Sequence, residues 1–211
     1  AAETLDPIDR PIIKDGLGCP LDQIYMATEG LLGATCRHGQ LHLAEDSIFF
    51  AFEDVGDGLV NPVITSFRRQ TQILARYRMN DLLRLSDTAC PCGSPLRVAD
   101  EIVGRMDDCF HIGSAGGAQI FTPDILRNAV LDADQRISDF RLIQTGDAQL
   151  ELVLPPDLPK TSADAAKSAL LHLMARRGTK ADVTCLIKAL PLDVSRKLRR
   201  VENRVTTKRK A

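Results

Sequence analysis

The chain has 211 residues, which is enough for one ordinary domain or for two small ones with cores of their own. Lys and Arg number 27 against 28 Asp and Glu, and the resulting formal charge of -1 is far from the strongly basic balance that favours binding to nucleic-acid backbones, so we do not expect bulk affinity for nucleic acids. The longest apolar runs, such as residues 48–52, are far shorter than the roughly 20 residues that cross a bilayer, so we expect no membrane segment.

The first residues and the cysteines indicate the compartment. Segment 1–6 lacks the basic start and the apolar stretch of a secretory signal. The 6 cysteines are too few and too scattered for a disulfide framework of the kind that small secreted proteins use. We therefore expect a cytoplasmic protein.

Residues up to about position 100 form short extended segments that glycine and proline interrupt. Segments 63–67 and 73–77 are rich in branched and aromatic side chains, which favour strands. The sequence therefore predicts a small β-rich subdomain, distorted and barrel-like, over residues 1–103.

From residue 121 onward the pattern changes to that of mixed helices and strands. Thr122 can cap a helix and Pro123 suits its first turn. Apolar residues then alternate over 150–154, recur at helical spacing over 165–174, and alternate again over 183–187. We expect a compact α+β unit over residues 104–211 that ends in a basic tail, so the whole chain is assigned to the α+β class.

The segment Tyr25–Gly30 is the first candidate site, because it places a hydroxyl and a carboxylate side by side before a glycine. Thr28 can position a phosphate oxygen, and Glu29 can hold a magnesium ion. The alternative is a plain turn with no ligand.

Two further clusters follow. Asp81 closes the segment 76–82 and could accept both hydroxyl groups of a ribose, although a surface ion pair with a neighbouring arginine is the alternative. The third cluster, Gly104–Asp108, contains Arg105 and precedes the helical half of the chain. Lys197 lies near the far end, where the alternative is one more residue of the basic tail.

The cysteines suggest a separate metal site. Cys90 and Cys92 form a tight pair, and a loop about fifty residues earlier carries a further cysteine and two histidines. Four ligands drawn from Cys36, His42, Cys90 and Cys92, with His38 as a substitute, would satisfy tetrahedral zinc. Buried inert thiols are the alternative. A closed ligand set of this kind would clamp the β-rich unit and would take no part in catalysis.

Taken together, the three clusters in this order resemble the late motifs of the adenylate-forming superfamily, which includes acyl- and aryl-CoA ligases and peptide-synthetase adenylation domains. Segments 41–46, 76–81 and 90–93 are most similar to phenylacetate–CoA ligase and its relatives. The likeness covers the chain from about residue 24 to residue 201.

The resemblance implies a role for each residue of the nucleotide site. Thr28 and Glu29 would contact the α-phosphate and Mg²⁺. Asp81 would hold the ribose, while Tyr25 and Arg105 would face the nucleotide.

The resemblance also implies a moving part. Asp107 falls at the hinge about which the smaller C-terminal lid of the family swings. Lys197 matches the lysine that bridges the substrate carboxylate and the α-phosphate, although Arg196 stands where the family usually has glycine.

The function that follows from the resemblance is that of the C-terminal portion of an ATP-dependent carboxylate-activating ligase. Such an enzyme uses ATP and Mg²⁺ to form an acyl or aryl adenylate from a small aromatic or other carboxylic acid, and coenzyme A is the expected acceptor. Nothing before Tyr25 resembles the phosphate loop or the acyl pocket of the family. We therefore expect a fragment of a protein of roughly twice this length, inactive without the missing N-terminal portion as its partner.

The sequence leaves the oligomeric state and an alternative function to be considered. A homodimer is compatible with the sequence. The alternative function is that of a zinc-stapled, non-catalytic binding module derived from such ligases.

Overall fold

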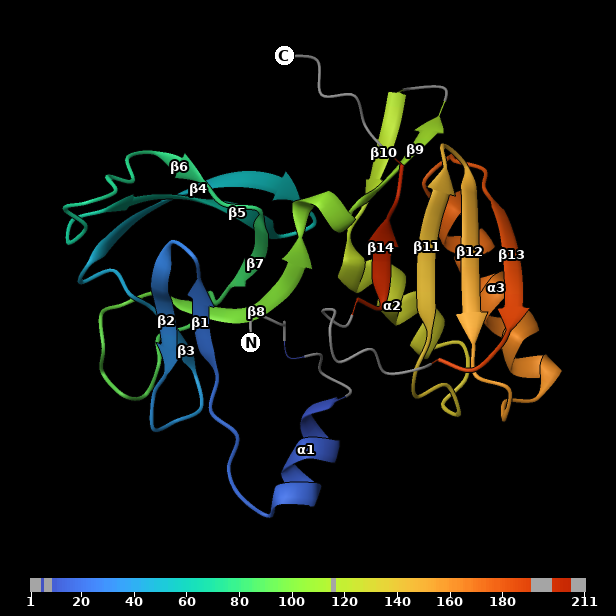
Figure 1. Cartoon of the computed structure of the whole chain (residues 1–211), viewed down its shortest axis with the longest axis horizontal. Coiled ribbons are helices and arrows are strands. Elements are labelled where there is room, and N and C mark those ends of the chain that lie inside the picture. The colour runs from blue at the N-terminus through green and yellow to red at the C-terminus, as the bar shows by residue number, and fades with distance from the viewer. Residues whose placement is uncertain (1–4, 6–8, 115–116, 191–198, 206–211) are drawn as a thin grey trace. The chain divides into compact units, whose positions relative to one another are not determined.

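The computed structural model describes residues 5, 9–114, 117–190 and 199–205. The chain folds into two compact units, Ala1–Met106 and Asp107–Ala211 (Figure 1). The expected α+β class, with a β-rich unit followed by a compact α+β unit, is confirmed. No helix in the described part of the chain is long and apolar enough to cross a membrane.

The first unit consists of a short helix and one antiparallel sheet. Helix α1 spans Asp9–Leu17. The sheet has the strand order β1-β2-β3-β8-β7-β5-β4, and β6 pairs with β5. The strands are β1 (Ile24–Ala27), β2 (Gly30–Thr35), β3 (Leu41–Leu43), β4 (Ile48–Gly56), β5 (Leu59–Ser66), β6 (Tyr77–Arg78), β7 (Asp81–Leu85) and β8 (Val98–Arg105).

The core of the first unit follows from strand alternation. In β4, Ile48 and Phe50 are buried while Phe49 between them is exposed, as the two-residue period of a strand requires. Tyr25 of β1 belongs to the same core and is only 4% exposed. Its ring is therefore packed among apolar side chains, which fixes the direction of its hydroxyl.

Strands β1 and β2 form a tight hairpin whose turn is made by Thr28 and Glu29. Ala27 pairs with Gly30 directly after the turn, and Gly30 has a φ of 133°. Residues other than glycine rarely adopt this backbone conformation, so glycine suits position 30, directly after Glu29.

The short 3₁₀ helix η1 (Met106–Asp108) contains the boundary, and the second unit continues with the hairpin of β9 (Phe110–Ser114) and β10 (Gly117–Phe121). A 4-stranded sheet follows in the order β13-β12-β11-β14. Helices α2 and α3 supply buried residues to the same core as this sheet. The bounds are α2 (Pro123–Leu131), β11 (Arg141–Gly146), β12 (Gln149–Leu154), α3 (Lys160–Arg176), β13 (Asp182–Ile187) and β14 (Val201–Asn203).

The strand expected over residues 73–77 is mostly absent. Only Tyr77 and Arg78 form a strand there, and Arg76 has a φ of 50°, which is incompatible with extended backbone. Leu74 reaches the core, but Ile73 is 77% exposed. The segment therefore lies on the surface as a loop and anchors itself through one side chain.

Candidate functional site

A hydrogen bond between two distant strands lies at the centre of the site. The Tyr25 hydroxyl donates to Oδ2 of Asp81 at a distance of 2.6 Å. Burial of the ring, and then the charge of Asp81 and this hydrogen bond, raise the pKa of Tyr25 far above its usual value. Tyr25 is therefore a neutral donor, and it fixes the orientation of the Asp81 carboxylate.

Asp81 lies where two strand ends meet. It is the first residue of β7 and pairs directly with Arg105, the last residue of β8, so the two side chains emerge on the same face of the sheet. The buried Asn61 amide donates to the carbonyl oxygens of Met79 and Asp81 at 2.9 and 2.8 Å. These bonds fix the backbone from which the Asp81 side chain projects.

Glu29 approaches the same region from the β1–β2 turn. A side-chain hydrogen bond with Glu29, followed by the charge of Glu29 and slight burial, raises the pKa of Tyr77. The charge of Glu29 also contributes to the raised pKa of Tyr25. Glu29 therefore lies within hydrogen-bonding reach of Tyr77 and within Coulombic reach of the Tyr25–Asp81 pair.

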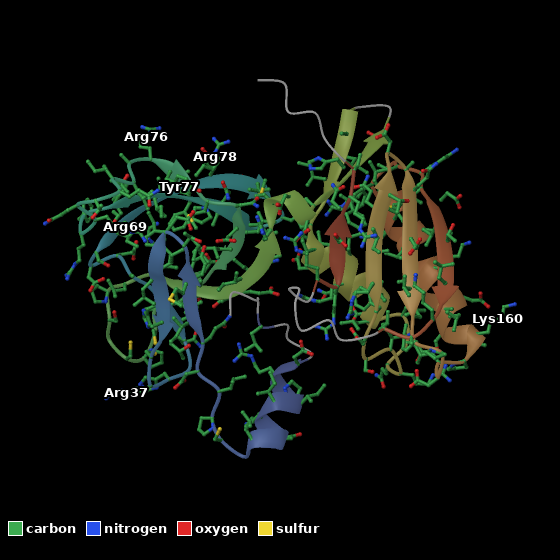
Figure 2. All side chains as sticks on the ribbon, viewed as in Figure 1. Arg37, Arg69, Arg76, Tyr77, Arg78 and Lys160 are labelled. Carbon is green, nitrogen blue, oxygen red and sulfur yellow. The ribbon has the colours of Figure 1, made fainter. Side chains whose placement is uncertain are left out.

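A cationic side chain supports the turn. Nη2 of Arg69, from the loop that follows β5, donates to the carbonyl oxygen of Thr28 at 2.8 Å. Figure 2 shows Arg69 and Tyr77 at the same edge of the first unit, together with Arg76 and Arg78. Arg69 thus places a positive charge next to the Thr28–Glu29 turn, which suits an anionic ligand.

A second cluster in the first unit joins two loops and strand β3. Sγ and Nε2 atoms of Cys36, His42, Cys90 and Cys92 all lie within 4.8 Å of one another. The Sγ atoms of Cys36 and Cys90 are 3.6 Å apart, and Sγ of Cys92 lies 3.4 Å from Nε2 of His42. The four residues predicted from the sequence as metal ligands are therefore brought together, whereas His38 is exposed and outside this group.

The electrostatics of Cys36 suit a thiolate. Burial raises the pKa of its thiol, but hydrogen bonds with the backbone of His38 and Gln40, and with the side chains of Cys90 and His42, outweigh that effect. The net result lowers the pKa of Cys36 to about 6. The deprotonated form is the one that binds metals.

Comparison with known proteins gives a fold. No protein-family model matches the sequence, and no curated protein matches it. The structure of 2-hydroxyisobutyryl-CoA ligase in the postadenylation state, in complex with R3-HIB-AMP, is similar with a TM-score of 0.68 at 20% identity. That match covers 94% of this chain and 46% of the ligase. The chain has the fold of part of an acyl-CoA ligase.

The same ligase in an open conformation, in complex with 2-HIB-AMP and CoA, gives a TM-score of 0.56 at 20% identity, covering 93% of this chain and 46% of that chain. This chain thus spans less than half the length of the ligase that it matches. Within this ligase fold, Tyr25, Glu29, Asp81 and Arg105 all belong to the first unit.

The remaining residues predicted for the site lie elsewhere. Thr28 is exposed in the β1–β2 turn next to Glu29. Asp107 is exposed in η1, directly after the boundary between the two units. Lys197 lies outside the described residues.

Three further residues of the candidate site are not predicted from the sequence. Tyr77 lies four residues before Asp81 within segment 76–82, and this shared segment is the signal that could identify it. Arg69 reaches Thr28 from a loop with no recognisable pattern, and Asn61 lies in the middle of a strand. Only the folded backbone brings these two side chains to the site.

Proposed function

We propose that the chain forms the C-terminal portion of an ATP-dependent carboxylate-activating ligase and supplies part of its nucleotide site. The observation that carries the proposal is the hydrogen bond from Tyr25 to Asp81, with Glu29 close to the same pair. The charge of Glu29 thus acts on the tyrosine that orients the Asp81 carboxylate. The ligase fold supports the proposal.

Asp81 would hold the ribose. A carboxylate has about four acceptor sites, of which the Tyr25 hydroxyl uses one, and adjacent sugar hydroxyls are suitable donors for others. Because Tyr25 is held in the core, the carboxylate is oriented before the nucleotide arrives, which lowers the entropic cost of binding.

Thr28 and Glu29 would face the α-phosphate. Magnesium prefers carboxylate and other oxygen ligands and keeps several of its waters, so one exposed turn with a carboxylate and a hydroxyl fits it. When bound, Mg²⁺ offsets the negative charge of the phosphates. Tyr77 lies within reach of the Glu29 carboxylate, and Arg69 fixes the backbone of Thr28.

The proposed reaction is an in-line displacement at phosphorus. An oxygen of the substrate carboxylate attacks the α-phosphorus, a mixed carboxylic–phosphoric anhydride forms, the bond to the β-phosphate bridging oxygen breaks, and pyrophosphate leaves. Arg105 would stabilise the negative charge that builds up on the phosphate oxygens. Lys197 is assigned the same task, and this assignment rests on the sequence resemblance.

The second unit would serve as a lid. Asp107, at the first position after the boundary, is proposed as the hinge about which this unit moves between adenylation and transfer of the acyl group to coenzyme A. The proposed substrate is a small aromatic or other carboxylic acid, as in phenylacetate–CoA ligase-like enzymes of the cytoplasm. This finer assignment rests on segments 41–46, 76–81 and 90–93.

Complementation tests the proposal. The chain is combined with an N-terminal segment that supplies the missing half of the ligase fold, and ATP–pyrophosphate exchange is measured with a panel of aromatic and aliphatic acids. We expect exchange that requires an acid, both segments and Mg²⁺. Binding of the two segments without acid-dependent exchange would contradict the proposal.

One observation favours a second candidate, a non-catalytic module held together by zinc. The Cys36, His42, Cys90 and Cys92 group is built independently of the nucleotide residues. Such a module would bind zinc and would show no exchange in the complemented assay.

A further inference from the structure

We propose that Cys36, His42, Cys90 and Cys92 bind one structural zinc ion that fastens the β2–β3 loop to the β7–β8 loop. Cys36 lies in the β2–β3 loop, His42 in β3, and Cys90 and Cys92 in the β7–β8 loop, so segments that lie far apart in the sequence meet in the fold. This inference does not depend on the proposed ligase activity, because none of the four residues belongs to the nucleotide site.

Two distances between ligand atoms match those of a tetrahedral zinc site. A zinc ion with Zn–S bonds of about 2.3 Å and Zn–N bonds of about 2.0 Å separates neighbouring ligand atoms by roughly 3.5–3.8 Å. The Cys36–Cys90 Sγ distance of 3.6 Å and the Cys92 Sγ to His42 Nε2 distance of 3.4 Å agree with this value. One ion at the centre of the group would therefore need little movement of the side chains.

His42 is oriented as a zinc ligand. Its Nδ1 lies 2.9 Å from the carbonyl oxygen of Leu96, a contact that requires Nδ1 to carry the proton. The other ring nitrogen, Nε2, is then unprotonated and faces Sγ of Cys92. Zinc-binding histidines commonly use such a backbone hydrogen bond to fix the tautomer. His42 is only 6% exposed, so this arrangement is shielded from water.

The two loops present their cysteines in the same way. In each, a cysteine begins a turn that closes with a glycine amide donating to the cysteine carbonyl oxygen, at 2.8 Å for Cys36 and Gly39 and 3.1 Å for Cys90 and Gly93. Both glycines have a positive φ, 76° and 79°. A residue with a side chain would be strained at either position, so the turns depend on glycine.

Backbone amides point at the sulfur atoms of these turns. The His38 amide lies 3.4 Å from Sγ of Cys36, and the Cys92 amide lies 3.5 Å from Sγ of Cys90. The Ser94 amide lies 3.4 Å from Sγ of Cys92. Each thiol of the group thus has an amide donor, which stabilises the thiolate form that zinc requires.

A disulfide between Cys36 and Cys90 is the competing interpretation. The two sulfur atoms are close enough to be oxidised with a small movement, since a disulfide bond measures about 2.05 Å. A disulfide would involve only two of the four residues and would not account for the positions of His42 and Cys92. The full set of ligands therefore favours zinc.

The position of the ion suggests what it does. Strand β2 begins after the Thr28–Glu29 turn and ends directly before Cys36, and β8 begins after the cysteine-bearing loop and ends at Arg105. Figure 1 shows the β1–β2 turn and the β2–β3 loop at opposite ends of the hairpin strands. Zinc would thus fix the ends of β2 and β8 that lie away from the nucleotide residues.

Metal analysis tests the inference on the purified chain, expressed in zinc-supplemented medium and kept reduced. We expect about one zinc per chain in the wild type, and at least a tenfold lower content in Cys36→Ser and Cys92→Ser. Cys185→Ser and His38→Ala are the matched controls and should retain zinc, because Cys185 lies in the second unit and His38 lies outside the group.

A spectroscopic measurement keeps the test independent of the variants' folding. Wild-type chain loaded with Co²⁺ should show thiolate-to-metal charge transfer and the intense visible bands of a tetrahedral ion, and X-ray absorption of the zinc form should give sulfur and nitrogen ligands in the ratio three to one. A metal-free wild type after reduction, an octahedral oxygen-ligated cobalt spectrum, or a Cys36–Cys90 disulfide as the stable form would each overturn the inference.

Discussion

The hydroxyl of Tyr25 donates a 2.6 Å hydrogen bond to the carboxylate of Asp81, and this bond joins β1 to the start of β7. The two strands are not neighbours in the sheet, so the contact crosses the interior of the first unit. It links the core, through the ring of Tyr25, to the polar site that contains Glu29 and Arg105.

The Tyr25→Phe variant tests the strength of this link. The ring stays in the core while the hydroxyl is lost, so we expect a fall of about 1.5–3 kcal/mol in the free energy of unfolding, as for other hydrogen bonds to a charged group. Urea denaturation of the chain measures it. Tyr77→Phe is the control for stability, because Tyr77 is 43% exposed, and it should change the value by less than about 0.5 kcal/mol.

The pH dependence of the free energy of unfolding also reports on the environment of Tyr25. The folded state raises the pKa of Tyr25, whereas the unfolded phenol ionises near pH 10. Above about pH 10 the unfolded state therefore loses a proton that the folded state keeps, and stability falls as pH rises, by up to about 1.4 kcal/mol per pH unit for this group. The fall should be smaller in Tyr25→Phe.

Ultraviolet absorbance follows this ionisation directly. The chain has no Trp and 2 Tyr, so Tyr77→Phe leaves Tyr25 as the only source of the phenolate band. We expect that band to appear together with unfolding at high pH. A reversible titration of Tyr25 near pH 10 in the folded protein would show that its environment is not the one described.

Much of the fold of the second unit could be predicted, because its local sequence patterns agree with the helices and strands that form. The strand alternation of β12 and β13 and the Thr122–Pro123 start of α2 all follow from short-range rules. The strand predicted over residues 73–77 is wrong. The branched and aromatic residues of this segment favour a strand, but Arg76 adopts a left-handed conformation and only Leu74 is buried. Composition alone does not say which apolar side chains find the core.

The candidate site could be predicted in part, because several of its residues stand in recognisable segments of the sequence. Tyr25, Glu29 and Asp81 stand in recognisable segments, and the cysteines stand in conspicuous turns. The contribution of Arg69 depends on a contact between a patternless loop and the backbone of a distant turn. Such a contact is specific to the folded chain and has no signature in the sequence.

The Asp81→Asn variant tests the assignment of the ribose in the complemented enzyme. Asparagine is uncharged and is a weaker acceptor, so we expect the KM for ATP to rise roughly 10- to 100-fold. The discrimination between ATP and its 2′,3′-dideoxy analogue should fall by a similar factor, which a structural defect would not produce. Asp100→Asn, an exposed change on β8, is the control and should leave both values unchanged.

The Asp107→Pro variant tests the hinge. Proline fixes its own φ and restricts the preceding residue, so rotation of the backbone at Met106–Asp107 should be blocked. We expect adenylate formation to persist and thioester formation with coenzyme A to fall at least tenfold in single-turnover measurements. Asp107→Ala keeps the backbone free and should retain both steps. Normal thioester formation by Asp107→Pro would exclude this residue as the hinge.

The central claim is that Glu29 acts on the nucleotide, and its most direct test is acid-dependent ATP–pyrophosphate exchange by the complemented enzyme carrying Glu29→Gln, measured against Mg²⁺ concentration. Glu53→Gln is the matched control, because Glu53 pairs with Arg78 near the same edge and is assigned no role in the reaction. We predict that Glu29→Gln lowers the exchange rate by at least about 100-fold and raises the Mg²⁺ concentration needed for half-maximal rate, while Glu53→Gln matches the wild type. A wild-type rate and an unchanged Mg²⁺ requirement in Glu29→Gln would contradict the account.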